Sequence, residues 1–311
     1  MSPHSARTLA QAKINLALRV LGKESDGYHA IETVFLRIDL GDDVRVDTNS
    51  RKRTLRCEVM RDVPKEKNLA FRAAELFSSE TGWPDGFAIE IEKRIPIGGG
   101  LGGGSADAAA VLRILNRLSP RPCTSEKIQT LAGVLGADVP FLASDSVMAL
   151  GWGHGEKLTP LTPLPSTDIQ LIIPSFGIST AEAYAEIDRR RNDSDYRAPI
   201  FTVEMFRSWH DAALNSVNDF EEVVHEQFRA AGLEPLLLQG TASKGGSLAR
   251  MTGSGSTIFV VQNTVALSRD RANIPRSSRN TPALRLARVS LDTKVITTRT
   301  STSVVPVELL D

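Results

Sequence analysis

A run of six glycines in seven residues, between a predicted strand and a predicted helix, most restricts how this chain can fold. The run is Gly98 to Gly104, interrupted only by Leu101. The preceding segment, Phe87 to Ile95, alternates apolar and polar side chains as a half-buried strand does, and the residues after the run, up to Leu118, have helical spacing. A loop of this composition can adopt positive φ and bring its backbone close to a ligand. We therefore predict a strand, a glycine loop and a helix, in that order.

The helix that starts after the glycine loop favours a phosphate as the ligand. The first N–H groups of a helix have no partner within it, and the positive end of the helix dipole lies at the same place. A tight connection without a ligand is the alternative. However, each interior glycine costs about 0.5–1 kcal/mol relative to alanine, and six such losses need a reason.

Two common nucleotide-binding loops match the run poorly. The run satisfies the G-x-G-x-x-G pattern, but a dinucleotide-binding domain also needs an acidic residue about twenty positions further on. Pro120 to Cys123 stand there instead. A Walker A loop would continue with lysine and then serine or threonine, whereas Ser105 and Ala106 follow the last glycine. An NAD-dependent oxidoreductase is therefore disfavoured.

Composition argues against several classes of partner. Thirty-seven basic and 37 acidic residues cancel, so the balance does not indicate a nucleic-acid surface, and an anionic ligand must be held locally. Cys57 and Cys123 lie far apart, without the spacing of metal ligands, and fit a reducing cytoplasm. We see neither a secretory leader nor an apolar run of about twenty residues. We expect a cytoplasmic protein that does not span a membrane, with 311 residues in one large or two moderate domains.

Two other segments hold polar residues that the pattern alone explains in more than one way. Within Leu9 to Leu21, Lys13 and Asn15 alternate with apolar residues, which is typical of a strand with one exposed face. Asp138 lies just before Val139-Pro140, where an aspartate is either a turn former or a functional carboxylate.

The rest of the chain predicts further strands and helices. Strands are expected at residues 43–47, 54–60, 169–173 and 294–309. Helices are expected at residues 68–81 with Asn68 as the cap, 125–135 with Ser125 as the cap, 212–224 and 226–238. Polar surface connections are expected at residues 188–199 and 269–282. The proline-rich segment from Thr159 to Thr167 is the expected boundary between two lobes.

Several motifs together resemble those of the GHMP kinases, the superfamily of galactokinase, homoserine kinase, mevalonate kinase and phosphomevalonate kinase. The glycine run resembles the second motif, AKINLAL from Ala12 to Leu18 the first, and TGSGS from Thr252 to Ser256 the third. LGADVP, which contains Asp138, also occurs intact. The doubled GGGLGGGS and the tetrapeptide DGYH are most similar to the family of 4-diphosphocytidyl-2-C-methyl-D-erythritol kinases.

This resemblance implies an α+β fold with two lobes, which we place at residues 1–162 and 163–311, and an active site in the cleft between them. It implies ATP-dependent phosphorylation of the 2-hydroxyl of 4-diphosphocytidyl-2-C-methyl-D-erythritol, giving the 2-phosphate and ADP in non-mevalonate isopentenyl diphosphate biosynthesis. The implied ligands are ATP, Mg²⁺ and this small-molecule alcohol, and not a nucleic acid. A GHMP kinase for another alcohol and a non-catalytic ligand-binding regulator are the alternatives.

The resemblance also assigns roles to individual residues. Lys13 and Asp138 correspond to the catalytic residues, and Asp138 is expected to accept the proton of the attacking hydroxyl. Ser105 is the candidate contact for Mg²⁺, and Ala106 replaces the usual second serine of the motif. The loop expected to wrap the ATP phosphates comprises Pro96, Ile97, Gly98, Gly99, Gly100, Leu101, Gly102, Gly103, Gly104, Ser105 and Ala106.

The candidate substrate-binding residues are Asn15, Tyr28, His29 and Tyr184. Because DGYH resembles the site that grips the cytidine in this family, we expect the pyrimidine to lie between the rings of Tyr28 and Tyr184, with His29 near its polar edge. On composition alone, Tyr28 and His29 could instead be a half-buried tyrosine and a solvated histidine, and Tyr184 could pack on its own helix.

Overall fold

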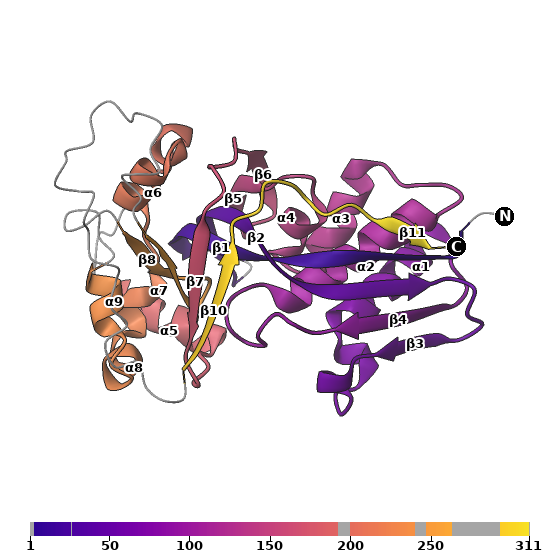
Figure 1. The fold of residues 1–311 in the computed structure, drawn as a ribbon, viewed down its shortest axis with the longest axis horizontal. Helices are drawn as coiled ribbons and strands as arrows, with labels where there is room; N and C mark the ends of the chain where they lie inside the picture. Colours follow the sequence, from indigo (N-terminus) through magenta and orange to yellow (C-terminus); the bar gives the residue numbers. More distant parts are fainter. Residues whose placement is uncertain (1–2, 26, 192–199, 240–246, 263–292, 311) are drawn as a thin grey trace.

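The computed structural model describes residues 3–25, 27–191, 200–239, 247–262 and 293–310 (Figure 1). Within these ranges, the strands form two mostly antiparallel sheets and the helices come largely in separate runs, which confirms the expected α+β class. In this part of the chain, no helix combines the length and the apolar character that a membrane span requires.

In the part of the chain that the structure describes, the larger sheet has seven strands in the order β11–β1–β2–β4–β3, with β5 on β2 and β6 on β5. All neighbours are antiparallel except β3 and β4. The strands are β1 (Ser5–Lys23), β2 (His29–Asp47), β3 (Arg53–Arg56), β4 (Phe87–Glu92), β5 (Met148–Gly153), β6 (Lys157–Pro160) and β11 (Glu308–Leu310).

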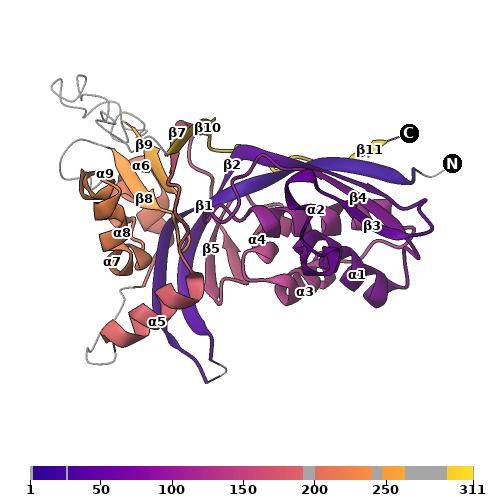
Figure 2. The ribbon, with the colours of Figure 1, turned by 90° about the horizontal axis from the view of Figure 1, so that it is seen from below.

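Four helices cover one face of the larger sheet (Figure 2). They are α1 (Leu69–Thr81), α2 (Gly103–Leu118), α3 (Ser125–Leu135) and α4 (Val139–Ala143). The apolar stripe predicted for α2 is buried against the sheet, where Leu112 and Leu115 join Ile14 and Leu16 of β1 in one core. This packing places the start of α2, and therefore the glycine loop, beside β1.

Among the described residues, the smaller sheet has four antiparallel strands in the order β10–β7–β9–β8. They are β7 (Asp168–Ile173), β8 (Leu248–Met251), β9 (Ile258–Val261) and β10 (Lys294–Arg299). The helices of this part are α5 (Thr180–Arg191), α6 (Trp209–Asn215), α7 (Phe220–Val223), α8 (His225–Ala230) and α9 (Glu234–Gln239), and short 3₁₀ helices lie at Glu58–Met60, Lys65–Lys67 and Val203–Phe206.

The long β1–β2 hairpin joins the two parts of the molecule (Figure 1). Ile14 and Leu16 of β1 belong to the larger core, whereas Leu18 and Val20 belong to the smaller core together with Phe220 and other apolar residues. One strand therefore carries residues of both cores. The side chains in the middle of β1 lie where the two cores meet.

The larger sheet combines strands from both ends of the chain. β11, close to the C-terminus, returns to the larger sheet and pairs with β1 through Ser5 and Leu310. The lobe division at residues 1–162 and 163–311 remains a prediction. The predicted connection at residues 269–282 lies outside the described residues, as does 192–199, whereas Asp188 to Arg191 form the last turn of α5.

Some details of the predicted elements are confirmed, whereas other elements have different caps or ends in the structure. Asn68 caps α1, its Oδ1 accepting from Ala70 N at 2.9 Å. Thr124, not Ser125, caps α3. The strand predicted at residues 54–60 ends at Arg56, and a 3₁₀ turn follows. The strand predicted at 294–309 is two strands, β10 and β11, separated by residues 300–307.

The prediction of one continuous helix at residues 212–224 is wrong. Two short helices lie there, and the segment between them forms backbone hydrogen bonds with β1 instead. α6 ends at Asn215 and α7 begins at Phe220. Between them, Leu18 N donates to Val217 O at 2.8 Å and Asp219 N donates to Leu18 O at 3.1 Å. The partner strand is about two hundred residues away in sequence, so no local pattern indicates this interruption.

Candidate active site

The glycine loop between β4 and α2 turns a set of backbone amides toward a cavity. Gly98, Gly100 and Gly102 have φ values of 74°, 76° and 72°, in the left-handed region that favours glycine. Gly102 is the N-cap of α2 and has no side chain to accept from the first amides of the helix. The amides of Gly103 to Ser105 have no acceptor within α2, because Ala106 N is the first to donate, to Gly102 O at 2.8 Å. This arrangement suits an anion.

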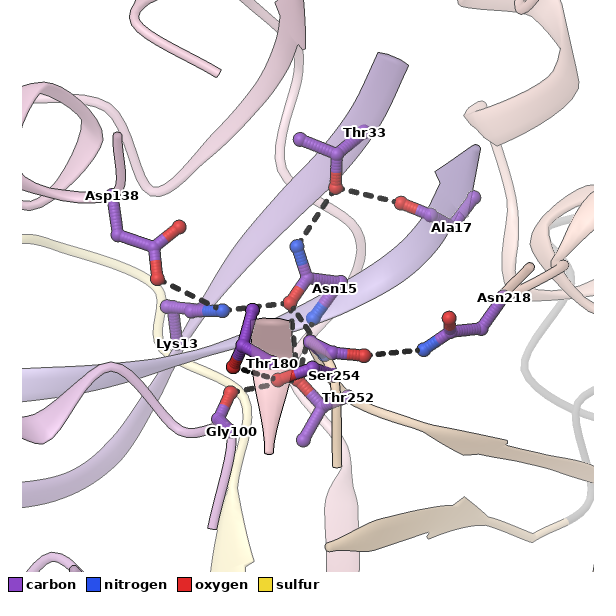
Figure 3. Close-up of polar contacts among 11 residues, drawn as sticks. Lys13, Asn15, Ala17, Thr33, Gly100, Asp138, Thr180, Asn218, Thr252 and Ser254 are labelled. Carbon is purple, nitrogen blue, oxygen red and sulfur yellow. Dashed lines mark hydrogen bonds and ion pairs between the residues drawn. The ribbon is translucent and has the colours of Figure 1, made fainter. Parts of the chain in front are cut away.

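Lys13, Asn15 and Asp138 form the polar centre of the site (Figure 3). Lys13 Nζ donates to Asn15 Oδ1 at 2.7 Å and lies 3.2 Å from Asp138 Oδ2. The side chain of Lys13 is 3% exposed and that of Asp138 is 30% exposed, so the lysine is covered while the carboxylate reaches the cavity. The interpretation of Lys13 and Asn15 as residues of an exposed strand face is therefore wrong.

The position of Asp138 at the start of α4 does not make it a cap. Its carboxylate accepts no hydrogen bond from the first amides of α4 and points to Lys13 instead. The other end of α4 is held by Arg37, whose Nη2 lies 2.8 Å from Phe141 O and 2.9 Å from Ser144 O. Burial lowers the pKa of Arg37 to about 9. The sequence left a turn former and a functional carboxylate open, and the geometry favours the second.

The loop between β8 and β9 contacts both Asn15 and the glycine loop. Asn15 N donates to Thr252 Oγ1 at 3.0 Å, and Gly253 N donates to Asn15 Oδ1 at 2.9 Å. The Thr252 hydroxyl lies 3.2 Å from Asn15 Oδ1 and 3.3 Å from Gly100 O, so it can donate to either. The hydroxyl of Thr252, the first residue of the third motif, thus joins the first motif to the second.

Two further residues, which were not among the predicted site residues, hold the polar centre of the site in place. Asn218 Nδ2 donates to Met251 O at 2.8 Å and Gly253 O at 2.9 Å, which holds the β8–β9 loop. Thr33 Oγ1 accepts from Asn15 Nδ2 at 2.8 Å and donates to Ala17 O at 2.8 Å (Figure 3). These contacts join residues that are distant in sequence, so neighbouring residues carry no signal for them.

An aromatic cluster forms where the tip of the β1–β2 hairpin meets α5. The rings of His29 and Tyr184 stack with centroids 4.5 Å apart, and the Tyr184 ring meets Phe220 edge-on at 4.9 Å. His29 Nε2 lies 2.6 Å from Asp188 Oδ1. Burial would raise the pKa of Asp188, but its hydrogen bonds to His29 and Lys23 lower it below the ordinary value. Burial, with a smaller effect of the Asp138 charge, raises the pKa of Tyr184 to about 12, so its hydroxyl stays protonated at neutral pH.

Tyr28 lies apart from this stack. It is 67% exposed, and its ring centroid is 5.2 Å from that of His154, whose Nε2 lies 3.1 Å from Glu24 Oε2. The structure thus brings His29 and Tyr184 together directly, while Tyr28 faces solvent beside His154. The arrangement of a pyrimidine between Tyr28 and Tyr184 remains a prediction.

One cavity, of about 510 Å³, collects most of the predicted residues. Lys13, Asn15, Asp138 and Tyr184 line it, as do the predicted loop residues except Ile97 and Ala106. Two cavities of similar size, about 540 and 650 Å³, lie on other surfaces of the molecule and share none of these residues. Size therefore does not identify the site. The convergence of a covered lysine, a carboxylate and unpaired amides makes this cavity the candidate active site.

The site can contribute only part of a metal's ligands. Among the described residues, no group of three or more histidine, cysteine, aspartate or glutamate side chains is arranged to hold a metal ion. Ser105 and Asp138 both line the cavity and offer single oxygens. That donor set fits Mg²⁺, which commonly takes one or two protein oxygens and completes its shell with substrate phosphates and water.

Known proteins resemble the chain in sequence over most of its length. Residues 68–146 match the model of the GHMP kinases N terminal domain. A 4-diphosphocytidyl-2-C-methyl-D-erythritol kinase of Paraburkholderia phytofirmans is 36% identical over 251 residues, covering 81% of this chain and 83% of that protein. A protein of the same name from Desulfitobacterium hafniense is 35% identical over 273 residues, with 85% and 89% covered.

The chain also resembles solved structures of kinases in its fold. A crystal structure of 4-(cytidine 5'-diphospho)-2C-methyl-D-erythritol kinase has a TM-score of 0.69 and 30% identity, covering 95% of this chain and 99% of that one. A mevalonate kinase with 14% identity and a TM-score of 0.54 covers 95% and 98% and shares the fold.

Proposed function

The chain belongs to the family of 4-diphosphocytidyl-2-C-methyl-D-erythritol kinases, and on that basis we propose that it transfers a phosphoryl group from ATP to the 2-hydroxyl of 4-diphosphocytidyl-2-C-methyl-D-erythritol. The products are the 2-phosphate and ADP. The observation that carries this proposal is that Lys13, Asp138 and the unpaired amides at the start of α2 line one cavity. Phosphoryl transfer needs positioning and charge stabilisation more than covalent catalysis, and these groups supply both.

Each group has a defined task in the transfer. The amides of Gly103 to Ser105 bind the β- and γ-phosphates at the positive end of α2. Asp138 accepts the proton of the acceptor hydroxyl, or orients it for attack. Lys13 stabilises the charge that develops on the transferred group, and Asn15 holds the ammonium group in place through its 2.7 Å hydrogen bond.

We propose that Mg²⁺ binds together with the nucleotide. It offsets part of the phosphate charge when bound. Ser105 Oγ is the protein oxygen that we assign to it, because Ser105 lies in the first turn of α2 and lines the cavity. Asp138 then keeps its carboxylate for the acceptor hydroxyl.

The choice of acceptor tests the proposed function directly. The purified protein is incubated with ATP, Mg²⁺ and, in separate reactions, the diphosphocytidyl alcohol, mevalonate and homoserine. ADP release and the mass of the product are measured. We expect phosphorylation of the diphosphocytidyl alcohol alone. Transfer to mevalonate or homoserine would indicate a GHMP kinase for another alcohol, and binding without ADP release would indicate the non-catalytic regulator.

The close contact between the two loops predicts that Gly100→Ala weakens ATP binding strongly. Gly100 has a φ of 76°, and a Cβ there would lie 2.2 Å from Thr252 O, so both the backbone and the neighbouring loop must move. A residue forced into such a conformation costs about 1–3 kcal/mol, and the displaced loop adds to that cost. Calorimetry should therefore show at least about a tenfold higher Kd for ATP.

A matched variant separates strain from the local clash. Gly82 also has positive φ, 69°, but a Cβ there meets nothing within 4 Å, and it lies at the far end of α1. Gly82→Ala should lower the melting temperature without changing the Kd for ATP. Normal ATP binding by a folded Gly100→Ala protein would remove the loop contact from the nucleotide site.

The aromatic residues near α5 predict a loss confined to the diphosphocytidyl substrate. Tyr28→Ala and Tyr184→Ala should each weaken its binding, since stacking of a base on an aromatic ring contributes about 1–3 kcal/mol by analogy with single-stranded nucleic acids. The Kd for ATP should stay unchanged. Tyr184→Phe keeps the ring and should bind the substrate like wild type. If Tyr184→Ala also does so, Tyr184 serves only to pack against Phe220 and His29.

A further inference from the structure

A buried cluster of three charged side chains lies behind the glycine loop. Lys93 Nζ is 2.5 Å from Asp42 Oδ2 and 2.8 Å from Asp107 Oδ2. The three side chains are 6%, 0% and 4% exposed, and none of them lines the cavity of the active site. Charged groups are rarely buried to this extent unless they are paired. Because these side chains are buried, water does not stabilise their charges, and they must stabilise one another.

The cluster joins three elements around the start of α2. Asp42 belongs to β2, Lys93 follows the last residue of β4, and Asp107 lies near the beginning of α2. Asp42 Oδ1 also accepts from the backbone N of Arg94 and Ile95, at 2.5 and 2.8 Å. The carboxylate of Asp42 thus holds the chain at the point where it leaves β4 for the glycine loop.

The ammonium group of Lys93 lies directly beside the loop. A Cβ built on Gly103, the first residue of α2, would be 3.3 Å from Lys93 Nζ. Burial would lower the pKa of Lys93, but the carboxylates of Asp107 and Asp42 raise it above its ordinary value, so the group stays charged at neutral pH. A positive charge is therefore fixed next to the amides assigned to the phosphates.

Asp107 links α2 to this lysine. It is the fifth residue of the helix, and its Oδ2 accepts from Lys93 Nζ at 2.8 Å, while its Oδ1 has no hydrogen-bond partner in the described part of the chain. Burial raises the pKa of Asp107 to about 7, and Lys93 opposes that shift. Without Lys93, this carboxyl would be protonated more readily, and α2 would lose its charged link to the end of β4.

We propose that Lys93 is a positioning residue for ATP, a role that rests on the proposed function. Its pairing with Asp42 and Asp107 fixes the start of α2, and with it the amides of Gly103 to Ser105, against the end of β4. Lys93 acts through the loop and does not touch the nucleotide. Its loss is expected to weaken ATP binding because the start of α2 is no longer held and the positive charge beside Gly103 is gone.

Three variants test this role by calorimetric titration with the non-hydrolysed analogue AMP-PNP and Mg²⁺, together with steady-state kinetics and a melting curve. Lys93→Met keeps the length of the side chain without its charge, and should raise the Kd for the nucleotide by about tenfold. The KM for the diphosphocytidyl alcohol should change less than about twofold. Asp107→Leu keeps about the shape of the side chain but removes the link between α2 and Lys93, and should also raise the Kd for the nucleotide by about tenfold.

Asp107→Asn keeps the shape of the cluster, and its amide oxygen can still accept from Lys93, so it should bind the nucleotide like wild type. Asp107→Leu tests the same link even if Lys93→Met fails to fold. Lys127→Met is the matched control, since its pair with Glu80 is exposed, and it should bind normally.

Two outcomes would overturn the role of Lys93. They are a folded Lys93→Met protein with wild-type nucleotide affinity, and a folded Asp107→Leu protein with wild-type nucleotide affinity. Wild-type protein that bound the nucleotide but phosphorylated no acceptor would instead contradict the proposed function.

Discussion

Asp138→Asn is expected to lower kcat by roughly 10²–10⁴, the range for removal of a general base, while both substrates still bind. Asparagine has nearly the same shape but cannot accept the proton of the acceptor hydroxyl. The effect should appear in kcat because the carboxylate matters most when the hydroxyl loses its proton. The measurement is steady-state ADP release at saturating concentrations of both substrates, with the Kd of each determined by calorimetry.

The position of Asp138 makes this variant a clean test. Its carboxylate does not cap α4, so the substitution should not disturb the helix. Asp145, an exposed acidic residue just beyond the other end of α4, gives the matched control. Asp145→Asn should keep wild-type turnover. An Asp138→Asn protein with kcat near that of wild type would show that Asp138 is not the base.

Lys13→Met should lower kcat by about 10²–10³, the effect of removing one preorganised group that stabilises transition-state charge. The ammonium group is held by Asn15 at 2.7 Å and Asp138 at 3.2 Å, in a position that is almost fully covered. A charge held in this way costs no reorganisation when the reaction occurs. ATP affinity should fall much less than kcat, because the charge matters most in the transition state.

Lys13→Met should remain folded, and a matched control variant is available. The variant leaves Asp138 partly hydrated, and Asn15 Oδ1 still accepts from Gly253 N, so the protein should remain folded. Lys52→Met, at an exposed bend between β2 and β3, should have wild-type kinetics. A change confined to the KM for ATP would contradict the role of Lys13. The double variant with Asp138→Asn should lose less than the product of the two single losses, since the two groups act together.

The glycine loop shows how far local reasoning reaches in this protein. Glycine density, an alternating strand before it and helical spacing after it predicted β4, the loop and α2, because each depends on backbone conformation and short-range side-chain pattern. The same reasoning failed at β1, where alternation suggested an exposed polar face. Lys13 and Asn15 are buried because the glycine loop and the β8–β9 loop cover them. Those covering segments are about 90 and 240 residues away in sequence, a separation that periodicity does not encode.

The sequence by itself determined the α+β class, elements such as α1, α2, α3 and β4, and the residue types of the candidate catalytic centre, since these follow from local propensity and from motifs that belong to one family. Only the tertiary structure decided which polar groups meet. It joined Thr252 to Asn15, aimed Asp138 at Lys13 rather than along α4, and enclosed Lys93 between Asp42 and Asp107. The physical reason is that a buried polar group must find partners wherever the packing of helices and sheets brings them. That packing is set by the whole core, which no single segment contains.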